Sequence, residues 1–453
     1  MSETKRSENK MGVMPIPKLL VQMSLPIMLS MLVQALYNIV DSIFVARINE
    51  NALTAVSLAF PMQNLMIAIA VGTSVGVNAV LSRSLGEKNY EAANDSAKNG
   101  LFLAFLSFII FAVVGLLITR PFFSFQTDDP QILKYGVTYL SLVCVLCLGV
   151  FMQIMLERLL QSTGRTFFTM ISQGTGAIIN IIFDPILIFG LFGFPKLGIA
   201  GAALATVFGQ FCGTLLALFF NIKFNHDIHI SFKGFRPNKR IIRTIYSVGL
   251  PSIIMQAIGS VMTFGMNKIL IQFTSTATAV FGVYFKLQSF IFMPIFGLNN
   301  GMVPIIAYNY GAHKKNRVVQ TIKLCIVSAI VIMAVGLSIF MLVPETLLGM
   351  FKASQDMLTI GVPALRTISL SFVFAGFCII VSSVFQALGN GMYSLIVSVC
   401  RQLLVILPAA TILGYVFGLR AVWWAIPIAE IVSVLMSSFF YRKIYKEKIA
   451  TLN

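Results

Sequence analysis

Gln161-Ser162-Thr163-Gly164 recurs as Gln386-Ala387-Leu388-Gly389, and Leu25-Pro26 recurs as Leu250-Pro251. Both motifs lie 225 residues before their second copy (251 − 26 = 225). A spacing that holds across most of a chain predicts two copies of one structural unit with few insertions between them. Further pairs keep the same spacing: Gly72-x-x-x-Gly76 with Gly297-x-x-x-Gly301, Gly86 with Gly311, and Tyr135-Gly136-Val137 with Ile360-Gly361-Val362.

The composition is that of a membrane protein. Of the 453 residues, 57% are hydrophobic and only 11% are charged, about half the share of charged residues found in soluble proteins. Twelve apolar stretches are each long enough to cross a bilayer. We therefore predict an all-α polytopic membrane protein with twelve transmembrane helices in two six-helix lobes. The predicted spans are 19–46, 52–82, 94–119, 135–162, 168–192, 198–221, 241–271, 276–307, 317–343, 358–388, 392–416 and 419–441.

The spans and the basic residues predict the topology. Because each copy has an even number of spans, both copies insert in the same orientation as parallel repeats. If the N-terminus and the even-numbered connections lie on one side, 23 of the 33 lysines and arginines lie on that side and only six on the other, which predicts a multi-pass cell-membrane protein with both termini in the cytoplasm. No removable signal peptide is expected. The predicted parts are a tail 1–18, an N-lobe 19–221, a linker 222–240, a C-lobe 241–441 and a tail 442–453.

Several function classes are disfavoured by what the chain contains. The net charge of +17 is explained by the lysines and arginines that gather on the predicted cytoplasmic side of the membrane. We therefore expect no nucleic-acid partner. Cys144-x-x-Cys147 lies in an apolar span and is expected to be inert, and His226-x-x-His229 is expected to be a solvated loop without a metal. No H-E-x-x-H, G-x-S-x-G or phosphate-loop motif is present, so we expect neither an enzyme nor an ATP-driven pump, and no cofactor.

Two similar helical bundles in a bilayer favour a transporter with alternating access around a cavity between the halves. Pro26 and Pro251 fall one to two turns into the first span of each copy, and Pro185 lies in the fifth span. A proline inside a helix removes a backbone hydrogen bond and bends the helix. These prolines are therefore either hinges or static kinks.

Two intramembrane carboxylates define a candidate cation site. Asp41 and Asp184 both fall in the outer half of the first lobe, and ionised carboxylates at this depth are costly. Asn38 and Asn180 precede them by three and four residues, which places each amide on the face of its carboxylate. Two carboxylates in a poorly solvated pocket favour neutralisation by a proton or a metal cation. The alternative is a structural hydrogen-bonded pair. We expect no bound metal here other than a transient Na⁺ at Asp41 and Asp184.

Further charged residues lie within the predicted spans outside this candidate site. Glu157, next to Arg158, is expected to reach the membrane interface by extending its side chain. Lys286 or Arg366 is expected to form a structural pair with Glu430, and a gate or a substrate contact stays open as the alternative.

Polar and aromatic side chains within the spans are candidates for the substrate cavity. The 39 phenylalanines and 22 methionines make a large adaptable apolar cavity easy to build. The candidates are Gln34, Tyr37, Gln63 and Asn64 in the first lobe, and Gln256, Tyr284, Lys286, Gln288, Asn299 and Tyr308 in the second.

The chain resembles the multidrug and toxic compound extrusion (MATE) transporters, specifically the bacterial DinF-like branch. The resemblance covers essentially the whole chain and rests on the order of several short motifs. These are Leu25-Pro26 leading to Tyr37-Asn38-Ile39-Val40-Asp41, the stretch from Gly72 into Gly86-Glu87-Lys88-Asn89-Tyr90-Glu91-Ala92-Ala93, Tyr308-Asn309-Tyr310-Gly311, and Leu159-Leu160-Gln161-Ser162-Thr163-Gly164-Arg165-Thr166.

The resemblance implies an exporter of amphiphilic or cationic drugs driven by inward H⁺ or Na⁺, with Asp41, Asn180 and Asp184 in the cation-linked network and Thr206 as its hydroxyl. Lys268 and Lys286 stand where other relatives carry acidic residues, which argues against a sodium site in the second lobe. We favour H⁺ over Na⁺ and expect a monomer in the lipid bilayer. The alternative function is a flippase for lipid-linked oligosaccharides.

Overall fold

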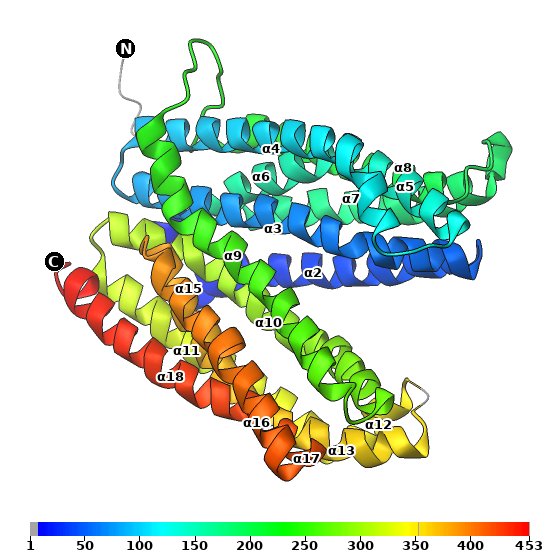
Figure 1. The fold of residues 1–453 in the computed structure, drawn as a ribbon. Coiled ribbons are helices and arrows are strands. Elements are labelled where there is room, and N and C mark those ends of the chain that lie inside the picture. The colour runs from blue at the N-terminus through cyan, green and yellow to red at the C-terminus, as the bar shows by residue number, and fades with distance from the viewer. Residues whose placement is uncertain (1–7, 352, 453) are drawn as a thin grey trace. The chain divides into compact units, whose positions relative to one another are not determined.

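The computed structural model describes residues 8–351 and 353–452; Lys5, Arg6 and Lys352, which entered the predicted charge distribution, lie outside these ranges. The described chain is almost entirely helical and contains no strand. The first copy comprises α1 (Lys10–Val13), α2 (Ile16–Ala46), α3 (Glu50–Gly86), α4 (Tyr90–Ser124), α5 (Pro130–Val145), α6 (Leu148–Ser162), α7 (Thr166–Phe189), the 3-10 turn η1 (Leu191–Gly193) and α8 (Ile199–Lys223) (Figure 1).

The second copy follows the same order after the linker. It comprises α9 (Lys239–Leu270), α10 (Ser275–Gly311), α11 (Lys315–Leu342), α12 (Pro344–Gly349), α13 (Gln355–Ser369), α14 (Phe372–Ala387), α15 (Gly391–Val399), the π-helix η2 (Cys400–Ile406), α16 (Leu407–Phe417), α17 (Leu419–Val422), α18 (Ala425–Ile444) and the π-helix η3 (Tyr445–Ile449) (Figure 1).

The predicted number of membrane spans is confirmed. Within the described residues, ten helices are long and apolar enough to cross a membrane, and the number is twelve when each of two bent pairs forms one span. These pairs are α5 with α6, bent by 45°, and α13 with α14, bent by 47°. The bends occur at the same place in both copies, as expected for a repeated unit.

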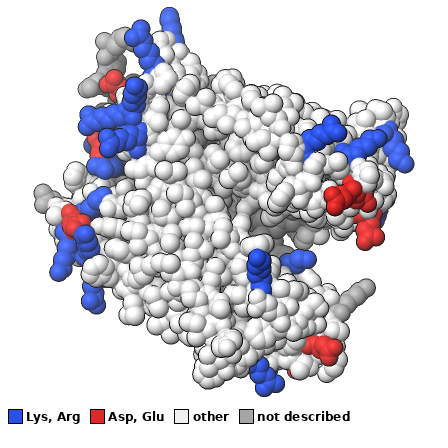
Figure 2. Space-filling model, viewed as in Figure 1, with Lys and Arg blue, Asp and Glu red and all other residues white. Residues whose placement is uncertain are grey.

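The surface has the polarity expected in a bilayer. On the face shown in Figure 2, charged side chains gather at the ends of the helices, and broad areas between them carry none. Large apolar side chains are exposed along the helices, for example Leu116 (68%) and Leu117 (70%) on α4. Because lipid tails are as apolar as these side chains, their exposure carries no penalty there.

The chain forms two compact units whose boundaries fall inside helices. The first unit contains Leu25–Gly249 and the second contains Met11–Ser24 together with Leu250–Asn453. Both crossings therefore lie one residue before a proline, Pro26 in α2 and Pro251 in α9. The predicted lobe limits at 19 and 241 differ from this division. The first turns of α2 belong to the second unit and the rest of α2 to the first, whereas the first turns of α9 belong to the first unit and the rest of α9 to the second.

Hydrogen bonds explain why Met11–Ser24 packs with the second unit. The Asn309 side chain donates to the Met11 carbonyl at 2.9 Å, and the Arg317 guanidinium donates to the carbonyls of Met11 and Met14 at 2.9 and 2.7 Å. Lys314 donates to the Gly12 carbonyl at 3.0 Å. Cationic and amide donors from α10 and the start of α11 thus satisfy the carbonyl groups of a short helix that cannot satisfy them itself.

Paired glycines bring α7 and α8 into close contact in the first unit. A Cβ atom on Gly209 would lie 2.6 Å from the Gly176 carbonyl oxygen, closer than side-chain atoms normally approach. Small residues at such crossings let helix backbones approach in membranes. The crossing lies about one turn from Asn180 and Thr206, so it determines how these two side chains meet.

We expect Gly209→Val to lower the free energy of unfolding by about 3 kcal/mol, because the added methyl groups must push the α8 backbone away from α7. Gly174→Val is the matched control, since a Cβ atom at that position of α7 meets no atom within 4 Å. Thermal unfolding in detergent compares the two variants. Equal stability of both would contradict the proposed close crossing.

Candidate functional site

Two carboxyl groups meet inside the first unit. Asp41 of α2 and Asp184 of α7 are direct neighbours. Asp184 is fully buried and Asp41 is half-buried. Asp41 Oδ1 and both carboxyl oxygens of Asp184 are buried and have no hydrogen-bond partner. Since ionised carboxylates only accept hydrogen bonds, two of them cannot satisfy each other, and a proton or another cation must do so.

Amide and hydroxyl groups adjoin this pair. Asn180, one turn before Asp184 on α7, donates through Nδ2 to Thr206 Oγ1 of α8 at 3.2 Å. The Thr206 hydroxyl donates in turn to the Ala202 carbonyl at 3.1 Å. Asn180 Oδ1 is buried and has no partner, so it is a further oxygen available to a proton donor or a cation. The structure brings Asp184, Asn180 and Thr206 onto one helix pair; their role in coupling stays a prediction.

Two tyrosines flank the carboxyl groups. Tyr37 and Tyr139 each lie close enough to Asp41 and Asp184 to interact with them electrostatically. Tyr37 lies near Gln34, one turn earlier on α2, and Tyr139 is 3% exposed and accepts a hydrogen bond from Gln63 at 3.3 Å. The predicted cavity residue Tyr37 thus lies beside the carboxylates, and Gln34 and Gln63 adjoin the two tyrosines.

Sequence reasoning missed Tyr139 and Gln173. Gln173 of α7 donates to the Gln34 side chain at 3.0 Å and ties α7 to α2. Gln173 was detectable, because it precedes Asn180 by seven residues and Asp184 by eleven, a spacing that places all three on one helix face. Tyr139 gave no such signal, since no carboxylate or amide side chain lies three, four, seven or eight residues after it in the apolar stretch.

Asn38 does not join this group in the structure. Its side chain is exposed, and within the described residues it has no hydrogen bond to either carboxyl group. Asn64 is half-buried on α3. Both remain predictions as cavity or coupling residues.

The predicted cavity residues of the second unit occupy varied environments. Tyr284 and Tyr308 of α10 are buried, whereas Gln256 and Gln288 are half-buried. Asn299 Oδ1 is buried and has no hydrogen-bond partner. Lys286 is exposed, with its ammonium group 6.0 Å from the Phe351 ring. Their contact with substrate stays a prediction.

The predicted pairing of Glu430 with Lys286 or Arg366 is wrong. Glu430 of α18 pairs with Arg401, whose Nη1 lies 2.9 Å from Glu430 Oε1. Arg366 is exposed and donates to the Met341 carbonyl. Arg401 lies in the π-helix η2, which packs against α18, so it reaches Glu430 from a neighbouring helix at similar depth. Tyr284 adjoins this ion pair.

The expectation that Glu157 extends to the membrane interface is also wrong. Glu157 and Arg158 of α6 are only 6% and 7% exposed. Glu157 Oε1 accepts hydrogen bonds from Gln153 at 2.9 Å and from the Ser172 hydroxyl at 3.0 Å. Because α6 packs against α3, α7 and α8, this carboxyl group is enclosed by protein and takes its hydrogen bonds there.

Two repeated six-span halves and a buried polar site inside one of them define a polytopic membrane transporter. The MatE family pattern matches residues 26–186 and 251–411, which are equivalent stretches of the two copies. The chain therefore belongs to the MatE family of transporters, as the sequence motifs predicted.

Individual relatives agree with this assignment. The multidrug export protein MepA of Staphylococcus haemolyticus (strain JCSC1435) is 29% identical over 423 residues, which cover 93% of this chain and 92% of that protein. A solved structure described as the outward-facing conformation of a multidrug resistance MATE family transporter superposes with a TM-score of 0.91 at 25% identity and covers 99% of both chains. A MATE crystal structure in the bent conformation gives 0.90 at 26% identity and covers 96% of this chain and 98% of its own.

Proposed function

We propose that this protein is an antiporter that exports amphiphilic or cationic drugs across the cell membrane in exchange for an inward cation, with H⁺ favoured over Na⁺. The observation that carries the proposal is the buried Asp41 and Asp184 pair with its three unpartnered carboxyl oxygens. Multidrug export is the activity named for the relative with 29% identity.

A proton fits the pair because it needs only the two carboxyl groups. One proton turns two repelling acceptors into a donor and an acceptor, so it removes the repulsion and creates a hydrogen bond. A sodium ion would need further oxygen ligands around it, and Asn180 Oδ1 is the additional unpartnered buried oxygen in this group. The hydrogen bond from Asn180 to Thr206 fixes the orientation of that amide.

Exchange follows if drug and proton prefer different states of the protein. A cationic drug is stabilised by the ionised pair and a proton neutralises it, so binding of one weakens binding of the other. A ligand shifts a conformational equilibrium only by its difference in affinity for the two states. We assign Asp41 and Asp184 to this competition, with Tyr37 and Tyr139 as their neighbours.

The test uses proteoliposomes that hold the purified protein and a fluorescent cationic dye. A pH gradient imposed without Na⁺ should drive dye movement, and a Na⁺ gradient at constant pH should not. Dye transport that requires Na⁺ and ignores the pH gradient would overturn the choice of proton. Movement of a lipid-linked oligosaccharide, without any dye transport, would instead favour the flippase.

We expect Pro26→Ala to slow dye transport about tenfold without lowering thermal stability, since alanine restores the missing helical hydrogen bond and stiffens α2 where the chain passes between the units. Pro61→Ala is the matched control, because Pro61 lies inside α3 and away from either unit boundary. Stopped-flow dye transport measures both rates. A Pro26→Ala variant as fast as the control would leave the kink purely static.

A further inference from the structure

Helices α4 and α11 are equivalent in the two copies, and each carries a lysine at the same position, but the surroundings of the two lysines differ. On α4, the linker covers the face: the His229 backbone N–H donates to the Asn94 side chain at 2.7 Å, and the Phe102 and Phe235 rings lie 5.9 Å apart. Lys98 on this face forms an ion pair with Asp95 at 2.7 Å. The first unit therefore supplies both a cover and a counter-ion for its lysine.

The second unit lacks this counter-ion at the equivalent position. The 225-residue spacing places Lys323 on Lys98 and Gln320 on Asp95, so the lysine is kept and its acidic partner is lost. Lys323 is exposed and has no ion-pair partner among the described residues. A pocket of about 580 Å³ lies along this face.

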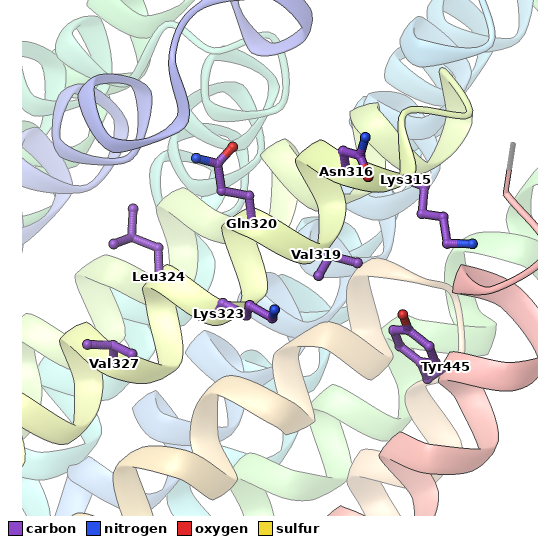
Figure 3. A pocket seen from close by; sticks show the side chains of 8 residues that line it. All are labelled: Lys315, Asn316, Val319, Gln320, Lys323, Leu324, Val327 and Tyr445. Atoms are coloured by element: carbon purple, nitrogen blue, oxygen red, sulfur yellow. The ribbon is translucent and has the colours of Figure 1, made fainter.

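The pocket combines basic groups with an apolar wall. Figure 3 shows that its lining side chains come from α11, together with Tyr445 from η3. In this view the ammonium groups of Lys315 and Lys323 extend to the side on which Tyr445 lies. Lys315 also donates to the Ala450 carbonyl at 2.9 Å, which ties the C-terminal segment to the pocket. No acidic residue lines the pocket.

An apolar track continues from the pocket along the same helix. Val327 lines the pocket, and Val331 and Val335 follow at four-residue spacing, so they share its face. These three valines are 57%, 57% and 56% exposed. Lys323 lies eight residues, or about 12 Å, inside the start of α11, a depth from which its flexible side chain reaches the level of lipid headgroups.

We propose that this pocket binds an anionic glycerophospholipid. Its phosphate lies between Lys315 and Lys323, and an acyl chain follows Val327, Val331 and Val335. The lipid phosphate takes the place that the Asp95 carboxylate occupies in the first unit. Basic pockets at the membrane interface recognise anionic headgroups in this way. Two lysines disfavour a cationic drug at the same position, so this site is independent of the proposed transport cycle and its coupling ion.

The test compares the full-length protein with its Lys323→Gln variant in nanodiscs of phosphatidylcholine that contain increasing phosphatidylglycerol. Native mass spectrometry counts retained phosphatidylglycerol, and thermal unfolding measures its stabilising effect. We expect about fivefold weaker phosphatidylglycerol retention in the variant, the factor typical of one basic residue near a membrane surface. Lys323→Arg should retain the lipid.

Lys233→Gln is the matched control, because it removes one exposed lysine from the linker and leaves the pocket intact. Retention of phosphatidylglycerol by Lys323→Gln equal to that of the control would overturn the proposal. Stabilisation by inorganic phosphate or glycerol phosphate in phosphatidylcholine alone would also overturn it, since it would identify a site for soluble anions.

Discussion

Asp184→Asn and Asp41→Asn should each lower dye export driven by a pH gradient about 100-fold, a factor typical of complete loss of coupling between two ligands. Asparagine keeps the size of the side chain, but it cannot take up a proton or carry a negative charge. Dye binding at equilibrium should survive in both variants, because loss of coupling does not remove the apolar part of the substrate site.

The control for this expectation is another buried carboxyl group of the same unit. Glu157 is 6% exposed and receives hydrogen bonds from Gln153 and Ser172, so Glu157→Gln tests burial without touching the carboxylate pair. We expect its dye transport to remain near that of the unmodified protein. Wild-type transport by both aspartate variants would contradict the coupling role of the pair.

The carboxylate site was predictable because it obeys helical periodicity. Asn180 and Asp184 lie four residues apart on α7, and this spacing alone places them on one face. Asp41 was selected as a carboxylate within a span and Tyr37 as a cavity candidate, and the structure places both near Asp184. Asn38 precedes Asp41 by three residues, which offsets the two side chains by about 60° around the helix axis, and Asn38 is exposed.

The repeat made the fold predictable from the sequence, but it did not predict where the chain divides into two compact units. Hydrophobic stretches and the 225-residue spacing specify twelve spans and their order. They carry no information on which unit the first turns of α2 join. That choice depends on Arg317 and Asn309, which bind the carbonyl groups of Met11 and Met14 across about 300 residues of sequence.

The ion pair between Arg401 and Glu430 shows a different limit of prediction from sequence. Depth in the membrane restricted the partners of Glu430, but Lys286, Arg366 and Arg401 all lie within spans. The partner is fixed by which helix packs on α18, and the π-helix at Cys400–Ile406 changes the direction of side chains relative to a regular helix. A face assignment based on 3.6 residues per turn therefore fails in this segment.

Breaking this pair should have the largest effect on stability. We expect Arg401→Met to lower the free energy of unfolding by about 3–5 kcal/mol, because it leaves the Glu430 carboxylate uncompensated in a buried position. Glu430 is 6% exposed at its side chain and Arg401 is 25% exposed, so the carboxylate has less access to other partners. Glu430→Leu should therefore cost less than Arg401→Met.

The double variant separates the contribution of the ion pair to stability from the cost of leaving one charge unpaired. Arg401→Met combined with Glu430→Leu should recover most of the lost stability, since replacing a buried ion pair by apolar residues of similar volume is close to neutral. Arg366→Met is the matched control, because Arg366 is exposed and donates to a carbonyl group, and we expect a change within about 0.5 kcal/mol. Denaturation in detergent micelles measures the free energy of unfolding of these four variants and of the unmodified protein. A larger loss for Arg366→Met than for Arg401→Met would return Glu430 to the partner that the sequence first suggested.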